Sequence, residues 1–254
     1  MTHVLLTVSA YGPAVPVGVN RRRLNLFRGM AAASLRAQTV RDVEWIVLLD
    51  RDDPLRMERV RVAESAGLPC RFIYFDPTLP EDDQAETGPL IDPGKRARFL
   101  NEGPVADSWF RVFYRAGRLF NMALPDRPSL ITRLDDDDAV TPDFLARIRA
   151  AATAEERVAW IFPEGFLVWP DGYRPYRHGT NMFVTHQNPP EGVHPFAISH
   201  NRVQHHLQVR FVDEQPAWAW LRHDDNLSKM RVRGELLPLD EKIRAMFPID
   251  WGLL

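Results

Sequence analysis

The chain has 254 residues, and its 32 basic and 34 acidic side chains give a formal net charge of −2. With 45% hydrophobic and 26% charged residues, its composition is that of a globular protein, which excludes disordered, collagen-like and coiled-coil classes. The near-neutral charge argues against a nucleic-acid-binding protein, and the single cysteine excludes a disulfide framework. The sequence shows no apolar run of membrane-spanning length and no signal-peptide start, so we expect a cytoplasmic protein.

The first 75 residues alternate between short apolar runs and amphipathic segments. We predict strands at residues 3–10, 44–50 and 70–75, and helices at residues 21–38 and 54–66. The strand at 44–50 is apolar almost throughout, which suits a parallel sheet covered on both faces. This alternation predicts an α/β fold with a mixed, mainly parallel sheet flanked by helices.

The rest of the chain is less regular. Several prolines predict a long loop at residues 76–107. The elements expected after it are a helix at 108–123, a strand at 129–134, a helix at 143–152, strands at 158–168 and 173–185, a helix within 194–209, and a strand leading into a loop at 218–225. We expect one domain, residues 1–254, whose C-terminal half is antiparallel and rich in loops.

The most informative feature is a run of four aspartates at residues 135–138, directly after the predicted strand at 129–134. Four adjacent carboxylates repel one another, so solvent, cations or protonation must relieve the repulsion. The carboxyl ends of strands are where open α/β sheets bind ligands, and Asp135 and Asp137 can share one face there. Such oxygen ligands suit Mg²⁺ or Mn²⁺ together with substrate phosphates. The alternative is a solvated acidic turn that precedes the next helix.

Several segments, in this order, resemble the landmarks of GT-A-fold glycosyltransferases. They are Ser-Leu-Arg-Ala-Gln-Thr at residues 34–39, the strand at 45–50, Arg-Leu-Phe-Asn at 118–121, the aspartate run at 135–138, and Pro-Asp-Phe-Leu at 142–145. The core Thr-Arg-Leu-Asp-Asp-Asp-Asp-Ala and the late Trp-Leu-Arg-His at residues 220–223 are most similar to the bacterial "putative rhamnosyltransferase" family. These landmarks extend over most of the chain.

The resemblance implies a metal-dependent glycosyltransferase that uses Mn²⁺ or Mg²⁺. Such an enzyme moves a sugar from a nucleotide-diphosphate sugar to a carbohydrate or lipid-linked hydroxyl acceptor, in bacterial polysaccharide or glycolipid synthesis. Residues 1–138 would form the nucleotide-sugar-binding half and residues 139–254 the acceptor-side half. The family allows peripheral contact with a membrane, although no basic amphipathic helix supports it here.

The resemblance also implies roles for single residues. The expected metal ligands are Asp137, Asp138 and His223. The expected donor-binding residues are Ser9, Tyr11, Asp50, Arg118, Asp135 and Asp136. After Asp50 the sequence departs from simpler relatives, since Arg-Asp-Asp-Pro replaces the commoner Asp-Gly-Ser, and this affects the predicted base contacts.

An inverting transfer also needs a general base that deprotonates the acceptor hydroxyl. We favour Asp224 and Asp225 because they follow His223 in the sequence. Other candidates, which spacing does not separate, are Glu164, Asp213 and His200.

Other readings of the sequence remain open. The spacing of Asp136, Asp138 and Val140 formally matches an aspartate-dependent phosphohydrolase, although that motif normally closes the first strand of its fold. A catalytically silent, carbohydrate-binding relative is a further alternative. Two smaller clusters are also ambiguous: histidines that could hold zinc, and arginines that form either a phosphate contact or a solvated helix face. These clusters are His200, His205 and His206, and Arg21, Arg22 and Arg23.

Overall fold

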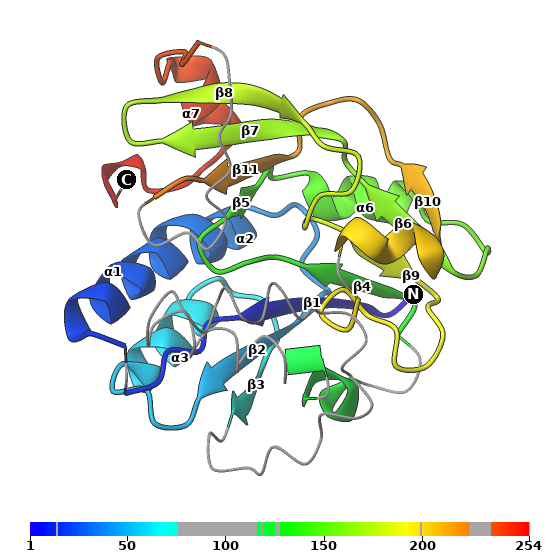
Figure 1. Ribbon diagram of the computed structural model, residues 1–254, viewed down its shortest axis with the longest axis horizontal. Coiled ribbons are helices and arrows are strands. Elements are labelled where there is room, and N and C mark those ends of the chain that lie inside the picture. Colours follow the sequence, from blue (N-terminus) through cyan, green and yellow to red (C-terminus); the bar gives the residue numbers. More distant parts are fainter. Residues whose placement is uncertain are drawn as a thin grey trace.

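A seven-stranded sheet forms the centre of the molecule (Figure 1). The structure, a computed structural model, describes residues 1–13, 15–75, 116–117, 119–124, 128–198, 200–223 and 235–253. In spatial order the strands are β10 (Gln208–Phe211), β6 (Val158–Ile161), β9 (Thr185–Gln187), β4 (Leu130–Arg133), β1 (His3–Val8), β2 (Glu44–Asp50) and β3 (Cys70–Phe75). Neighbours pair in parallel except at β9, which is antiparallel to both β4 and β6. The predicted mixed, mainly parallel sheet is confirmed.

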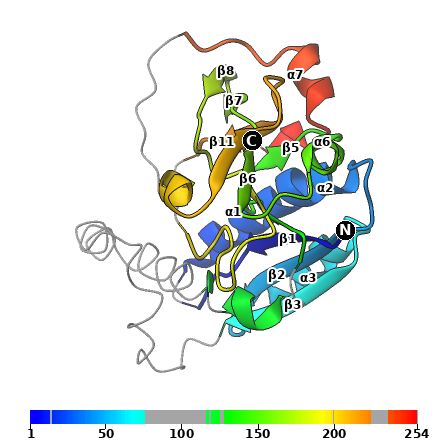
Figure 2. The same ribbon diagram turned by 90° about the vertical axis from the view of Figure 1, so that its right-hand side faces the viewer.

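A smaller sheet has the order β5 (Ala139–Val140), β11 (Trp218–Leu221), β7 (Glu164–Trp169) and β8 (Gly172–Arg177). Together with α7 (Glu241–Met246) it lies at one end of the molecule, and β3 lies at the other (Figure 2). Strand β5 follows the aspartate run, and β11 ends shortly before His223. Because Ala139 pairs with Ala219, the small sheet brings the aspartate run and His223 together.

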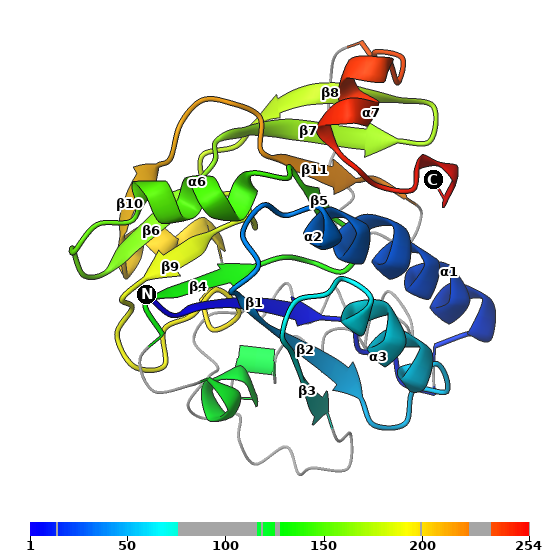
Figure 3. The same ribbon diagram turned by 180° about the vertical axis from the view of Figure 1, so that it is seen from behind.

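One helical segment lies between the two sheets (Figure 3). It consists of α1 (Val17–Phe27), a π-helical turn (Arg28–Ala32) and α2 (Ala33–Arg36), and it begins earlier than the predicted residue 21. Leu24 and Phe27 pack into the core of the large sheet, whereas Leu26 and Met30 pack under the small sheet. The helices α3 (Arg56–Glu64) and α6 (Phe144–Ala151) cover the same face of the large sheet.

Close packing fixes the position of β11 against β7. The Trp218 ring lies over Gly165, where a Cβ atom would be 2.1 Å from the ring carbon Cδ2, so no larger residue fits without displacing the ring. Trp218 also stacks on Phe183, with ring centroids 5.0 Å apart, and its Nε1 donates to the Phe162 carbonyl at 2.8 Å. These contacts hold the strand that leads to His223.

The structure corrects two predicted strands. The stretch predicted at 158–168 divides at Phe162 and Pro163 into β6 and β7, which belong to different sheets. The stretch predicted at 173–185 divides in the same way into β8 and β9. Between these two strands, the Asn181 amide donates to the Phe162 carbonyl at 2.6 Å, so both breaks lie at the junction of the two sheets.

The helix predicted within 194–209 is present only as a short 3₁₀ helix. This stretch contains a 3₁₀ helix at His200–His205 and then β10, which pairs in parallel with β6. Val203 and Leu207 are buried at a spacing that suits a helix. From Gln208, however, the chain is extended and forms backbone hydrogen bonds with β6.

Parts of two predictions lie outside the described residues. They are the whole loop at 76–107 and the first half of the helix at 108–123; residues 116–117 and 119–123 are helical. Among the helices that the structure describes, none is both long and apolar enough to span a bilayer.

Candidate active site

The predicted donor-side residues meet at one edge of the large sheet. Ser9 and Tyr11 follow β1, Asp50 ends β2, and residues 135–138 follow β4. Because β1 is parallel to both β2 and β4, these three strands end on the same side. This is the edge at which open α/β sheets bind ligands.

Asp136 is fully buried and accepts hydrogen bonds from three side chains. Ser9 Oγ donates to it at 2.8 Å, Tyr11 OH at 2.9 Å and Arg23 Nη2 at 3.1 Å. Burial raises the pKa of Asp136, and the Arg23 guanidinium opposes that rise. Ser9 and Tyr11 therefore anchor Asp136 within the protein and do not present free hydroxyls.

Asp137 contacts two cationic or potentially cationic groups. Its Oδ2 lies 2.5 Å from Arg23 Nη1 and 3.0 Å from His223 Nε2. Burial alone would raise the pKa of Asp137, but Arg23 and His223 together hold it well below its usual value. Asp137 is therefore a carboxylate at neutral pH. It lies next to His223, the histidine that the family resemblance proposes as a metal ligand.

Asp138 and Asp135 differ from these two. Asp138 Oδ1 accepts from the Leu221 backbone N–H at 3.1 Å, whereas its buried Oδ2 has no hydrogen-bond partner among the described residues. Burial, followed by Asp137 and Asp135, raises the pKa of Asp138 well above its usual value. Asp135 is paired with Arg133 through two hydrogen bonds of 2.9 Å. Arginine pairing and protonation thus relieve the repulsion that the four carboxylates imply.

Arg23 is the central residue of the site, and the sequence left it ambiguous within a run of three arginines. Its Nε donates to Tyr11 OH at 2.6 Å, in addition to the contacts with Asp136 and Asp137, and its side chain is only 4% exposed. Its position on the helix could have identified it in the sequence. Asn20, Leu24 and Phe27 form the buried stripe of α1, and Arg23 lies on that stripe while Arg21 and Arg22 are exposed.

A second buried arginine supports the same edge. Arg59 Nε donates to Asp53 Oδ2 at 2.7 Å, and its Nη1 donates to Ser9 Oγ at 2.9 Å. The Arg59 guanidinium lies 4.4 Å from the centre of the Tyr11 ring. Asp50, also buried, accepts from the Asp52 backbone N–H at 2.8 Å.

The pair formed by Asp137 and His223 has the spacing of two cation ligands. Oxygen and nitrogen ligands about 2.1 Å from an octahedral cation are about 3.0 Å apart when they are adjacent. Asp137 Oδ2 and His223 Nε2 are 3.0 Å apart, a hydrogen-bond distance that is also compatible with two adjacent ligands of such a cation. No group of three His, Cys, Asp or Glu side chains within the described ranges is arranged to hold a metal, and Asp138 is not brought into such a group. A cation here would depend on ligands from the substrate and from water.

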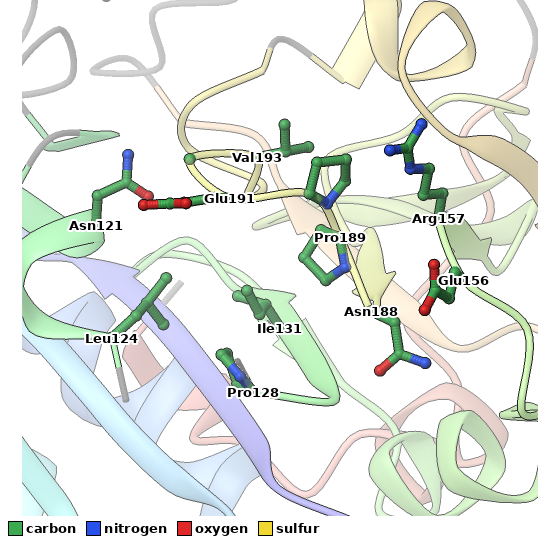
Figure 4. Close-up of a pocket in the computed structure, with 12 residues that line it drawn as sticks. Asn121, Leu124, Pro128, Ile131, Glu156, Arg157, Asn188, Pro189, Glu191 and Val193 are labelled. Atoms are coloured by element: carbon green, nitrogen blue, oxygen red, sulfur yellow. The ribbon is translucent and has the colours of Figure 1, made fainter. Parts of the chain in front are cut away.

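The structure also has a pocket of about 870 Å³ at the opposite, amino-terminal ends of β4 and β6 (Figure 4). Asn121 and Glu191 face each other on one side of it, and Glu156 and Arg157 lie on the other. Ile131 and several prolines line the space between them. This pocket is separate from the aspartate run, because the two lie at opposite ends of the sheet.

Three predicted site residues lie outside the described part of the chain: Arg118, Asp224 and Asp225. Two of the other base candidates are engaged by arginines. Asp213 pairs with Arg147, with one hydrogen bond of 3.0 Å, and Glu164 pairs with Arg177.

Comparison with known proteins gives one family match. A family model described as "Putative rhamnosyl transferase" matches residues 71–235. No curated protein sequence matches the chain.

Solved structures with a related arrangement are distant. TarS of S. aureus, residues 1–349 in complex with UDP-GlcNAc, is 9% identical with a TM-score of 0.46, over 91% of this chain and 62% of that one. A protein described as "putative nucleotide-diphospho-sugar transferase" from Desulfovibrio desulfuricans G20 is 11% identical with a TM-score of 0.39, over 88% of this chain and 83% of that one. Core-mannan synthase A from Aspergillus fumigatus, in an Mn/GDP form, is 12% identical with a TM-score of 0.36, over 67% and 44%. This chain thus spans less than two thirds of the TarS structure. Structural similarity at this level does not establish an activity.

Proposed function

Because the chain belongs to the family described as "Putative rhamnosyl transferase", we propose that it transfers a sugar from a nucleoside diphosphate sugar to a hydroxyl group. The acceptor would be a carbohydrate or a lipid-linked sugar of bacterial polysaccharide or glycolipid synthesis. The observation that carries the proposal is the pair of Asp137 Oδ2 and His223 Nε2, 3.0 Å apart at the carboxyl edge of the sheet. Residues 1–138 would bind the donor and residues 139–254 the acceptor.

In this proposal Asp137 and His223 hold Mn²⁺ or Mg²⁺ together with the donor's diphosphate. The transfer breaks the bond between the sugar and the diphosphate oxygen and forms a bond from the sugar to the acceptor oxygen. A divalent cation supplies Lewis-acid stabilisation of the charge on the departing diphosphate. Asp137 stays ionised because Arg23 and His223 lower its pKa, and the contacts of Ser9 and Tyr11 with Asp136 fix the aspartate run.

The acceptor hydroxyl must lose a proton to a base if the configuration inverts. An arginine that binds a carboxylate occupies the oxygen atoms that would take the proton. Asp213 and Glu164 are both paired in this way. We therefore propose that Asp224 or Asp225, next to His223 in the sequence, takes the proton.

A phosphohydrolase that uses an aspartate nucleophile is disfavoured. Its motif would need Asp136 or Asp138 to attack phosphorus, but both side chains are fully buried. Asp136 is also surrounded by its three hydrogen-bond donors. A catalytically silent relative is distinguished by experiment.

Thermal unfolding against UDP, GDP and dTDP, each with and without Mn²⁺, tests the proposal. A ligand at about 100 times its dissociation constant stabilises by about 2.7 kcal/mol, which raises the midpoint by roughly 5–10 °C at this chain length. We expect such a rise only when Mn²⁺ and one diphosphate are both present, and we expect Asp137→Asn to abolish it. A silent relative that binds donor would pass this test but release no nucleoside diphosphate from the matching sugar donor. Absence of any rise would contradict donor binding.

A further inference from the structure

Arg23 Nη1 lies where the two candidate cation ligands converge. It is 2.5 Å from Asp137 Oδ2 and 2.9 Å from His223 Nε2, and these two atoms are 3.0 Å from each other. When Nε2 of His223 carries a proton it donates to Asp137; when it carries none it accepts from Arg23, and its lone pair could then bind a cation. The guanidinium group and a cation bridging the same two atoms would therefore compete for one position.

We propose, on the premise of the transferase function above, that Arg23 holds the cation position in the nucleotide-free protein and must release Asp137 and His223 before a divalent cation binds there. Arg23 is then the residue that makes cation binding depend on the donor's diphosphate. It acts as a built-in competitor, with its charge already neutralised by Asp136 and Asp137.

The contacts of Arg23 show what its release requires. Its Nε is held by Tyr11 OH at 2.6 Å, and its Nη2 is held by Asp136 at 3.1 Å. The guanidinium group is planar and rigid, so Nη1 cannot leave Asp137 and His223 while Nε and Nη2 both keep these contacts. Release therefore moves the whole group, which also gives up its contacts with Tyr11 and Asp136.

Charge balance explains why the diphosphate is needed. A divalent cation that replaces one N–H contact would lie close to the guanidinium group, and like charges in a poorly hydrated site repel strongly. The oxygens of a diphosphate supply negative charge between the two, and guanidinium groups bind phosphate oxygens well. Cation and diphosphate should therefore bind cooperatively in the wild-type protein.

Mn²⁺ titration of the nucleotide-free protein, followed by the electron paramagnetic resonance of free Mn²⁺, tests this inference. We expect Arg23→Met to bind Mn²⁺ at least about tenfold more tightly than the wild type, since the guanidinium group no longer occupies the position between Asp137 and His223. The matched control is Arg133→Met. It removes a positive charge from Asp135 in the same aspartate run without a contact to Asp137 or His223, and should change the affinity less than about threefold.

Three results would overturn the inference. They are unchanged or weaker Mn²⁺ binding by Arg23→Met, an equal gain in Arg23→Met and Arg133→Met, and diphosphate binding by the wild type that needs no cation and is lost in Arg23→Met. The last result would mean that Arg23 replaces the cation permanently. If circular dichroism shows that Arg23→Met is unfolded, Arg23→Lys is used. Lysine lacks the planar fork that holds Asp136 and Asp137 together, so its Mn²⁺ affinity should still rise, and no rise would overturn the inference.

The Mn²⁺ titration needs no sugar nucleotide, so its outcome is separate from that of the transferase proposal. Failure of the transferase function would appear as absence of diphosphate binding in the thermal assay. Failure of the Arg23 inference would appear with Mn²⁺ alone.

Discussion

The two ends of the large sheet bury polar groups in opposite ways. At the carboxyl end, full charges are buried as pairs: Arg23 with Asp136 and Asp137, and Arg59 with Asp53. Toward the amino end, the buried polar groups include three histidines that are kept neutral. They are His3, His186 and His194, with pKa values lowered to about 3, 3 and 4, mainly by burial.

The pocket and the buried charges therefore lie at different ends of the sheet. The pocket of about 870 Å³ lies at the amino end, whereas the candidate cation ligands and the charge network lie at the carboxyl end. A substrate can exchange contacts with the charges of a buried ion pair, but not with a neutral imidazole. We therefore place the proposed site by its charges and not by the size of the cavity.

The largest expected effect is on the stability of the carboxyl end. Arg59→Met leaves Asp53 as a buried, unpaired carboxylate, which should lower the free energy of unfolding by about 3–5 kcal/mol. Urea unfolding measures it. The control is Arg21→Met, which breaks the exposed pair with Glu58 and should cost at most about 1 kcal/mol. Equal losses in the two variants would mean that the buried pair contributes no more than a surface pair.

The pH dependence of stability should distinguish the two ends. The folded state keeps His3, His186 and His194 neutral down to about pH 4, whereas the unfolded chain protonates them below about pH 6.5. The unfolded state thus binds more protons in this window, and each histidine removes up to about 1.4 kcal/mol of stability per pH unit as the pH falls. Asp137, whose pKa is lowered, stabilises the fold above its unfolded pKa, and this contribution is lost only at lower pH.

Urea unfolding at pH 7, 6 and 5 checks this window. His3→Gln should reduce the slope with pH, because the pKa of His3 is lowered to about 3. A slope that does not respond to His3→Gln would show that His3 is not a source of the acid sensitivity.

Ligand binding provides the third comparison of the two ends. Asp137→Asn should weaken binding of the matching nucleoside diphosphate with Mn²⁺ by about 100-fold, which corresponds to about 2.7 kcal/mol. Glu191→Gln, in the pocket of Figure 4, should not change it. Isothermal titration calorimetry measures both. Loss of binding in Glu191→Gln alone would move the donor site to the opposite end of the sheet.

The smallest expected effect concerns Asp138. Its raised pKa means that the fold favours the protonated form, so its contribution to stability is present at low pH and is lost as the pH rises through the folded pKa. Asp138→Asn cannot ionise and keeps an acceptor for the Leu221 N–H, so it should stabilise the protein by about 1 kcal/mol or more at pH 8, by less at pH 5, and not below about pH 4, where the unfolded chain also protonates Asp138. Destabilisation at pH 8 would instead indicate that Asp138 is needed as a carboxylate, for example as a cation ligand.

Local patterns predicted the N-terminal half of the fold better than the C-terminal half. The strands at 44–50 and 70–75 match β2 and β3. A short apolar run in an alternation of helices and strands packs as a strand of the central parallel sheet. In the C-terminal half, the chain changes sheets at Phe162 and again between β8 and β9. A local pattern shows that a residue is in a strand but not which sheet the strand joins.

The same limit applies to the site. The strand-end rule pointed to the aspartate run, and the family resemblance pointed to Ser9 and Asp50; the structure places all three at one edge. The partner of that run could not be predicted in this way. Arg23 and His223 come from α1 and from the segment after β11, and only the tertiary fold brings them to Asp137.

A crystal structure with Mn²⁺ and the matching nucleoside diphosphate would test the central claim most directly, through the anomalous signal of manganese. The account predicts one manganese peak that contacts both Asp137 Oδ2 and His223 Nε2, with Arg23 Nη1 moved from these atoms toward the diphosphate. A peak elsewhere, or a diphosphate bound while Arg23 still holds Asp137 and His223, would contradict it.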